Sequence, residues 1–168
     1  MLLLASGNRE VAGVFWKNRR SRSPLAKMLF TRLLIPRPTL DAILAHARAE
    51  LPNECCGLLA GVIADDIGRV SEHFPIRNDR ASPTEYESNP RDMLAAVRAM
   101  RVAGTEVLAI YHSHPTSAPV PSRKDLARNF WGETVAHVII GMSGSDPEVR
   151  AWWLTETDYR PAEFVTQS

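Results

Sequence analysis

The sequence has little of what secreted, redox-active or membrane-spanning proteins require. Its 168 residues contain only two cysteines, Cys55 and Cys56, which are neighbours in the chain. Adjacent cysteines provide no disulfide framework and lack C-x-x-C spacing, so we expect free, buried thiols in a reducing cytoplasm. No apolar run approaches the roughly 18 residues that a membrane span needs. The apolar start of the chain precedes the basic residues, whereas an export signal has the opposite order. These absences predict a soluble cytoplasmic protein without a membrane partner.

Charge is balanced over the whole chain but divided along it. The formal net charge is +1, and the hydrophobic and charged fractions of 45% and 23% are typical of globular domains. Residues 1–37 hold eight Lys or Arg and one acid, whereas residues 38–168 hold 12 basic and 18 acidic residues. The basic part shows no helical or strand periodicity. We therefore predict a disordered basic leader at residues 1–32, or translation that starts at Met28, and a single domain at residues 33–168.

Beyond the leader, hydrophobic periodicity predicts an alternation of helices and strands. Helices are expected from Thr39, as N-cap, to Pro52, from Pro90 to Gly104, and from Ser122 to about Trp131. Strands are expected at residues 57–63, 69–76, 107–112, 135–142 and 149–155. A turn at 65–68 separates the first two strands, and a long loop occupies 77–90. This order predicts an α/β domain with helices packed on a sheet.

Two histidines stand at the carboxyl end of the predicted central strand. Residues two apart on a strand point the same way, so His112 and His114 face one point while Ser113 faces away. A Pro-rich loop at 115–121 can fold back and bring Asp125 to the same point. Two imidazoles and one carboxylate leave a fourth position open, which is typical of a catalytic rather than a structural zinc. Such a zinc makes hydroxide available at neutral pH.

Hydrolysis at such a site also needs a general base and a donor for the oxyanion. Glu54, just before a predicted buried strand, is the candidate base, and Ser122 is the candidate donor. Each residue also has a plainer interpretation. Glu54 could be a solvated loop carboxylate, Ser122 and Asp125 a capping box, and the histidines ordinary core or surface groups. Capping and catalysis are compatible, and the combination of all five residues favours the catalytic interpretation.

The string His112-x-His114-Pro-x6-Ser122-x-x-Asp125, with Glu54 upstream before Cys-Cys-Gly-Leu-Leu-Ala-Gly, resembles the motif of JAMM (MPN+) metalloproteases. The similarity covers essentially the whole predicted domain. It implies a curved, mixed β-sheet flanked by helices, of the cytidine-deaminase-like α/β kind. It further implies one zinc ion per chain held by His112, His114 and Asp125. By the same resemblance Glu54 is the base and Ser122 stabilises the tetrahedral intermediate.

The compact form and the strings Glu-x-Cys-Gly-Leu-Leu and Tyr-His-Ser-His-Pro are similar to prokaryotic members of that family. This implies hydrolysis of an amide bond at the C-terminal Gly-Gly of a ubiquitin-like or sulfur-carrier protein, including release of cysteine from a carrier–cysteine adduct. The alternatives are removal of a ubiquitin-like modifier from protein lysines and a non-catalytic MPN scaffold. Scaffold members have lost the five residues that this chain retains. The basic leader lies outside the predicted domain, so no nucleic-acid partner is expected.

Two further features have more than one interpretation. The loop at 77–90, which carries Tyr86, is long enough to cover a site, although a plain surface loop is the commoner case. Trp152 and Trp153 are expected in the core or at an interface. Exposed strands beside these tryptophans would allow a homodimer, although nothing requires one.

Overall fold

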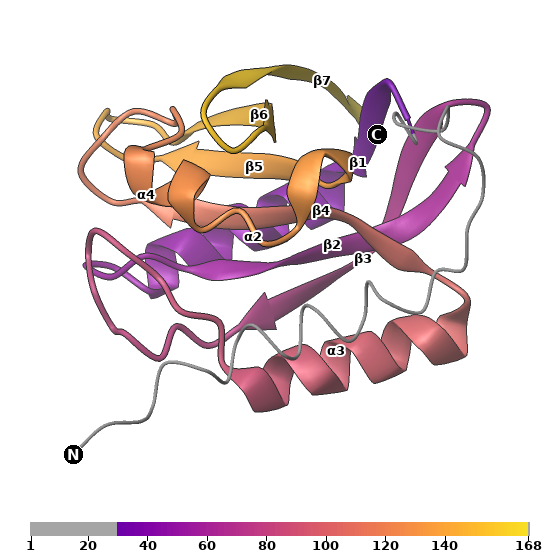
Figure 1. Ribbon diagram of the computed structural model, residues 1–168. Coiled ribbons are helices and arrows are strands. Elements are labelled where there is room, and N and C mark those ends of the chain that lie inside the picture. Colours follow the sequence, from indigo (N-terminus) through magenta and orange to yellow (C-terminus); the bar gives the residue numbers. More distant parts are fainter. Residues whose placement is uncertain (1–29, 168) are drawn as a thin grey trace.

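Seven strands close into one mixed sheet in the computed structural model, which describes residues 30–167 (Figure 1). The strands are β1 (Arg32–Pro36), β2 (Cys56–Ala64), β3 (Ile67–Ile76), β4 (Glu106–His114), β5 (Ala136–Gly141), β6 (Glu148–Leu154) and β7 (Tyr159–Gln167). Their order is β1-β3-β2-β4-β5-β6-β7, and β7 returns to pair with β1. The helices are α2 (Arg37–Ala49), α3 (Pro90–Ala103), the short α4 (Arg123–Ala127) and the 3-10 turn η1 (Gly132–Thr134). The predicted α/β class is confirmed.

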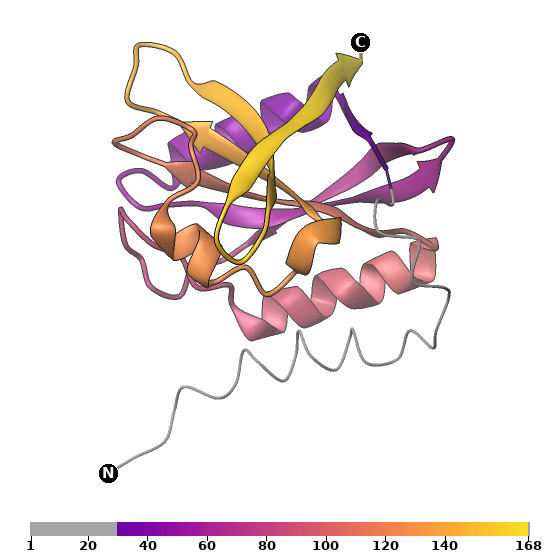
Figure 2. The ribbon, with the colours of Figure 1, turned by 45° about the horizontal axis from the view of Figure 1, so that its top comes forward.

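The two faces of the β2–β4 pair pack against different helices. Leu59 of β2 belongs to the same buried cluster as Ile43 of α2. Leu58, the neighbour of Leu59 in β2, points to the other face, and with its β4 partner Ile110 it belongs to a second cluster that contains Met100 of α3. Figures 1 and 2 show α2 and α3 on opposite sides of these strands. Because side chains alternate along a strand, each face has its own hydrophobic core.

Local sequence signals fix several element boundaries. Asp65 and Asp66 both adopt a positive φ (53° and 58°) and form the two-residue turn between β2 and β3, as a hairpin turn of this length requires. Asn89 caps α3 by accepting hydrogen bonds from the N–H groups of residues 91 and 92. Gly104 ends α3 in the left-handed conformation, with φ of 72°. The predicted turn and the predicted helix end are thus confirmed.

Two predicted helices are wrong in their bounds. Thr39 is not an N-cap but lies buried inside α2, which begins directly after Pro36 and ends at Ala49, before Pro52. The helix predicted from Ser122 to Trp131 ends at Ala127. It ends there because the Asn129 side chain, a few residues on, donates hydrogen bonds to the carbonyls of Gly132 and Leu154 and so binds the following turn to β6.

The first and last strands, β1 and β7, were not predicted from the sequence. β1 and β7 pair with each other in parallel over five residues, and β1 also pairs in parallel with β3. Because β7 is present, β6 is paired on both of its edges, with β5 on one side and β7 on the other. Trp152 and Trp153 are buried, as expected for core residues. Within residues 30–167, β6 and its neighbour β7 are each bonded on both edges, and a homodimer remains a prediction.

The described part of the chain begins inside the core. Phe30 is 1% exposed, and its ring centroid lies 5.0 Å from that of Trp153. The predicted leader and the predicted start at Met28 concern residues outside the described range, so both stay predictions. No helix within residues 30–167 is long and apolar enough to cross a membrane. Cys55 and Cys56 are free and buried, and burial raises the pKa of their thiols to about 11 and about 12.

Candidate metal centre

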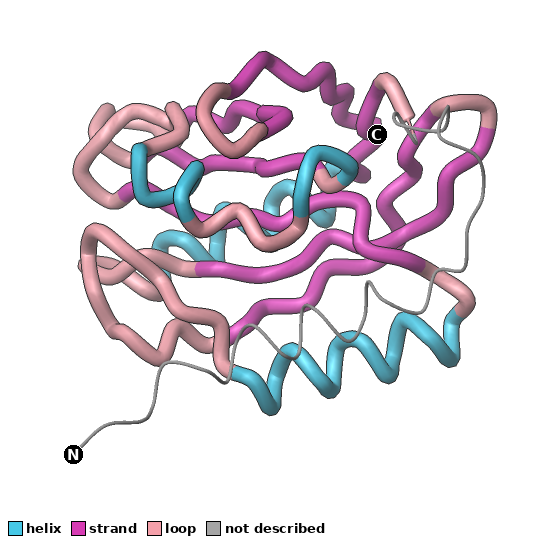
Figure 3. The backbone as a smooth tube through the Cα atoms, in the orientation of Figure 1, coloured by secondary structure: helices cyan, strands magenta, loops and turns pink. Residues whose placement is uncertain are grey.

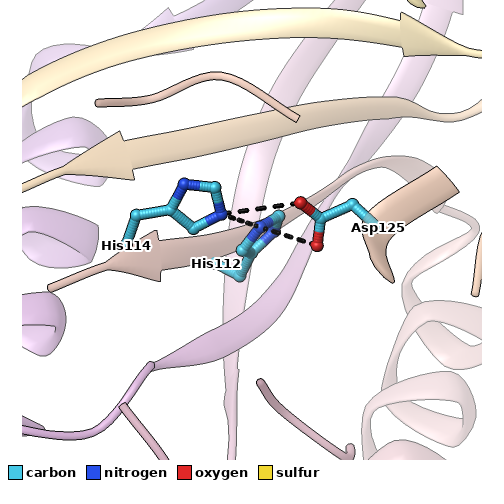
Figure 4. A group of neighbouring side chains, drawn as sticks. All are labelled: His112, His114 and Asp125. Carbon is cyan, nitrogen blue, oxygen red and sulfur yellow. Dashed lines mark hydrogen bonds and ion pairs between the residues drawn. The ribbon is translucent and has the colours of Figure 1, made fainter. Parts of the chain in front are cut away.

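Three ligand-type side chains converge at the end of β4 (Figure 4). The Nε2 atoms of His112 and His114 lie 3.1 Å apart. Asp125 of α4 places Oδ1 3.4 Å from His112 Nε2 and Oδ2 3.5 Å from His114 Nε2. Figure 3 shows that loops gather at this end of the sheet. The structure therefore brings together the three predicted ligands, although Asp125 follows His114 by 11 positions and lies on a different element.

The strand register explains how the two histidines come to face one point. They continue the face of Ile110, whereas Ser113 points to the other face and its Oγ accepts a hydrogen bond from the Cys55 N–H at 2.9 Å. His114 Nδ1 lies 3.0 Å from the carbonyl oxygen of Ala118, which accepts a hydrogen bond when Nδ1 carries the proton. In that tautomer the His114 Nε2 lone pair points at the cluster, as in metal-ligating histidines whose other nitrogen is bonded.

The donor set fits zinc. Two imidazole nitrogens and one carboxylate are ligands that zinc favours, and three protein ligands match a site with an open position. Burial opposes ionisation of Asp125, but hydrogen bonds with His112 and His114 outweigh it and hold the pKa of this carboxyl well below its usual range. Burial alone would lower the pKa of His114. The hydrogen bond with Asp125 opposes this effect, and the net result is a raised pKa. The carboxylate is thus ionised and available as a ligand.

The loop between His114 and α4 is held by β5 and β6. The indole Nε1 of Trp152 donates a hydrogen bond to the carbonyl of Pro119 at 2.8 Å. Gly141, the last residue of β5, lies so close to this loop that a Cβ atom there would be 2.5 Å from Pro119 Cδ. Leu126 of α4 packs on the cluster that contains Trp152. These contacts fix the direction in which the loop returns, and hence the position of Asp125.

Ser122 forms the capping box that the sequence allows. Its N–H donates to Asp125 Oδ2 at 2.6 Å, and its Oγ accepts from the Asp125 N–H at 3.2 Å. The hydroxyl proton of Ser122 takes part in neither bond, and the residue is exposed. Capping therefore leaves this O–H able to donate to a molecule at the centre.

Glu54 lies beside the cluster and not within it. In the antiparallel pairing of β2 with β4, Cys56 faces His112, and the ladder continues because the Ser113 N–H donates to the Cys55 carbonyl at 3.1 Å. Continuing this register places Glu54 next to His114. The residue is 5% exposed, so the interpretation as a solvated loop carboxylate is wrong. Burial raises the pKa of Glu54 to about 7. The charge of His114 opposes this rise, whereas repulsion from Asp125 adds to it.

The loop between β3 and α3 covers one side of the centre. The Tyr86 ring lies against the His112 imidazole, with centroids 5.0 Å apart and planes inclined by 32°. The loop and the α4–η1 segment enclose a cavity of about 290 Å³ that reaches Asp125. Its walls include Tyr86, Phe130 and Trp131. The sequence singled out Tyr86 only as part of a long loop, and no local pattern pointed to the contact with His112.

Charged side chains join the two walls of this cavity. Glu85 of the loop lies 2.9 Å from Arg128 Nη1 and 3.5 Å from Lys124 Nζ. The hydrogen bond from Arg128 is the largest influence on Glu85 and lowers the pKa of its carboxyl. These pairs could not be predicted from the sequence, because Glu85 and Arg128 are 43 positions apart and meet only through the fold.

Comparisons with known proteins point to one family. The family model described as prokaryotic homologs of the JAB domain matches residues 36–155. The chain is 35% identical over 127 residues to the CysO-cysteine peptidase of Mycobacterium tuberculosis, covering 74% of this chain and 84% of that protein. It is 38% identical over 109 residues to the desampylase of Haloferax volcanii, covering 62% and 77%. It is 38% identical over 125 residues to a probable TtuB-protein conjugate cleaving protease of Thermus thermophilus, covering 74% and 77%. A solution structure of a Desulfitobacterium hafniense protein matches with a TM-score of 0.74 and 30% identity, over 82% of this chain and 93% of that one.

Proposed function

The chain belongs to the family of prokaryotic homologs of the JAB domain, and from that premise we propose that it is a zinc metallopeptidase acting on conjugates of a ubiquitin-like or sulfur-carrier protein. The scissile bond is the amide at the C-terminal Gly-Gly of the carrier. The observation that carries the proposal is the convergence of His112, His114 and Asp125 beside the buried carboxyl of Glu54. The names of the relatives, which are peptidases and conjugate-cleaving enzymes, support the substrate class.

Zinc is the metal that the donor set suits best. His112 and His114 would hold it through Nε2, and Asp125 through its carboxylate. When bound, zinc supplies a Lewis acid that polarises the scissile carbonyl and acidifies water at neutral pH. The buried face of β4 and the capped start of α4 hold the three donors close together.

Glu54 is the proposed general base. A carboxyl whose pKa lies near 7 can both accept and return a proton at neutral pH, which is the condition for efficient acid–base catalysis. Glu54 accepts a proton from the attacking water and donates it to the nitrogen of the leaving amine. Ser122 is the proposed oxyanion donor, since its free O–H can bond the carbonyl oxygen as that oxygen gains negative charge.

The cavity beside Asp125 is the proposed site for the end of the carrier. A Gly-Gly terminus has no side chains, and we place it in this cavity, which Tyr86, Phe130 and Trp131 line. The ion pairs from Glu85 to Lys124 and Arg128 hold these walls together at the rim. The complete set of site residues argues against the scaffold alternative.

Cleavage of defined conjugates tests the substrate class and identifies the leaving group. We expect incubation with a carrier–cysteine adduct or with a carrier–lysine isopeptide to yield carrier with a free Gly-Gly carboxylate, detected by mass spectrometry. A chelator should abolish cleavage and added zinc should restore it. Preference between the two conjugates separates cysteine release from removal of a modifier from lysines. If neither conjugate is cleaved by protein that holds zinc, the proposed substrate class is wrong.

A further inference from the structure

The backbone on both sides of the Glu54 side chain is held by hydrogen bonds to the loop after β3 and to β4. Glu54 and Cys55 precede β2 and belong to no helix or strand. The Glu54 N–H donates to the carbonyl of Ser82 at 2.9 Å. The Glu54 carbonyl accepts from the Asn78 side chain at 3.0 Å. The next N–H, of Cys55, donates to Ser113 Oγ at 2.9 Å. Two side chains, Asn78 and Ser113, thus bond the carbonyl and the N–H of the peptide group that joins Glu54 to Cys55.

Every polar atom of the Asn78 side chain is bonded to backbone groups, one of which is the Glu54 carbonyl. Its Nδ2 donates to the carbonyls of Glu54 and, at 3.2 Å, of Glu85. Its Oδ1 accepts from the N–H groups of Arg80 and Glu87, both at 3.0 Å. The residue is 9% exposed. One amide therefore joins the backbone of Glu54 to both sides of Tyr86, the residue that lies against His112.

Ser113 holds the same segment from the opposite side. It is 0% exposed, and it lies between the two proposed ligands but faces away from them. Its Oγ accepts from the Cys55 N–H, while its own N–H donates to the Cys55 carbonyl at 3.1 Å. The strand that carries His112 and His114 is therefore bonded directly to the residue after Glu54. These contacts set the distance between the carboxyl and the centre.

We propose that Asn78 and Ser113 are positioning residues that hold Glu54 in register with the metal centre. The inference rests on the proposed function, because it assigns these residues a role through the proposed base. Neither side chain lines the cavity, and neither is a ligand or a proton carrier. Their effect is on geometry alone, and a displacement of about 1 Å at a reacting group can lower turnover about a hundredfold.

Asn78→Asp tests the first residue with nearly no change in volume. The variant keeps the oxygen that accepts from residues 80 and 87 but loses both donors, so an oxygen faces the Glu54 carbonyl. We expect kcat to fall about tenfold to a hundredfold while KM and zinc content stay unchanged. The loss should persist on the alkaline plateau of the pH profile, which separates displacement of Glu54 from a mere shift of its pKa by the new charge.

Asn89→Ala is the matched control. Asn89 is a buried asparagine of the same loop that caps α3 and bonds Asp79, with no bond to Glu54. Its loss should lower the melting temperature while kcat stays unchanged. The inference is overturned if Asn78→Asp keeps wild-type kcat, or if its loss of kcat merely follows a loss of zinc or of folded protein.

Ser113 provides a second, independent pair of variants should Asn78→Asp fail to fold. Ser113→Ala removes the acceptor of the Cys55 N–H, and we expect lower kcat at unchanged zinc content. Ser113→Thr keeps the γ-oxygen and should recover most of the turnover. Equal kcat in the Ala and Thr variants would contradict the role. Failure of the proposed base has a different signature, since Glu54→Gln would itself keep turnover whatever the Asn78 and Ser113 variants do. Failure of the proposed substrate class would appear in the wild type, as no cleavage of either conjugate by protein that holds zinc.

Discussion

At the scale of the residue, the centre depends on the two-residue period of a strand and on one buried carboxyl. The i, i+2 rule was enough to predict that His112 and His114 share a face, and the structure agrees. The capping box also followed from local spacing. The burial of Glu54 could not be predicted, because it arises from a loop that folds over it and from pairing with β4. The same holds for Asn78 and Tyr86, whose contacts join distant parts of the chain.

The raised pKa of Glu54 predicts a pH-dependent stability difference in metal-free protein. The pKa is about 7 in the folded state against an ordinary value of 4.5. The neutral carboxyl therefore contributes stability that is fully present below pH 4.5 and is lost as the pH rises through 7. Glu54→Gln cannot ionise. Its free energy of unfolding relative to wild type should therefore rise by up to about 3 kcal/mol between pH 4.5 and pH 8. Urea unfolding at both pH values measures this, and a pH-independent difference would show that Glu54 is not buried as described.

Ser122→Gly separates the hydroxyl from the helix cap. Glycine is a tolerable N-cap, so we expect the free energy of unfolding to fall by only a few tenths of a kcal/mol. Turnover should fall about a hundredfold, because the oxyanion loses its donor. Zinc content should not change, since Asp125 remains. Steady-state kinetics with metal analysis checks this, and unimpaired kcat would leave Ser122 as a cap alone.

At the scale of the element, the short α4 is positioned by what surrounds it. Five residues are too few for a stable isolated helix, so α4 depends on its capping box and on the packing of Leu126. The sequence predicted where this helix begins but not where it ends. Its end depends on the Asn129 side chain, which reaches the backbone of β6, and such a contact leaves no local pattern.

Gly141→Ala should disturb the centre from the end of β5. The new Cβ would meet Pro119 and the carbonyl carbon of Ala118, whose oxygen lies against His114 Nδ1. The loop must shift, so we expect zinc affinity to fall about tenfold to a hundredfold, as for other changes behind a ligand. Gly144→Ala is the control, because a Cβ there meets nothing closer than 3.5 Å. Competition with a zinc indicator measures both, and equal affinities would show that the loop does not depend on Gly141.

At the scale of the whole molecule, closure of the sheet depends on the two strands that the sequence did not reveal. β1 joins β3 to β7 through parallel pairing on both of its edges. The class and the local strands were predictable from periodicity, since each hydrophobic run is contiguous. Closure was not, because β1 has only five residues and its partners lie more than 30 and more than 120 positions away.

Truncation tests where the folded unit begins. Removing residues 1–27 should leave melting temperature and turnover unchanged, because the described core starts at Phe30 and β1 at Arg32. Removing residues 1–36 also deletes the buried Phe30, Leu33 and Ile35, so it should cost at least about 4 kcal/mol of stability. Thermal denaturation of the two forms decides this. A large loss in the shorter truncation would mean that the basic segment contributes to the folded unit.

In the proposed enzyme, one zinc ion held by His112, His114 and Asp125 acts together with Glu54 in hydrolysis. The decisive measurement is zinc content and turnover of a carrier conjugate on the same preparations of wild type, Glu54→Gln and His112→Ala. We predict about one zinc per chain with turnover in wild type, the same zinc with turnover reduced at least about a hundredfold in Glu54→Gln, and neither zinc nor turnover in His112→Ala. A fully folded wild-type protein that takes up no zinc, or Glu54→Gln that turns over like wild type, would contradict the claim.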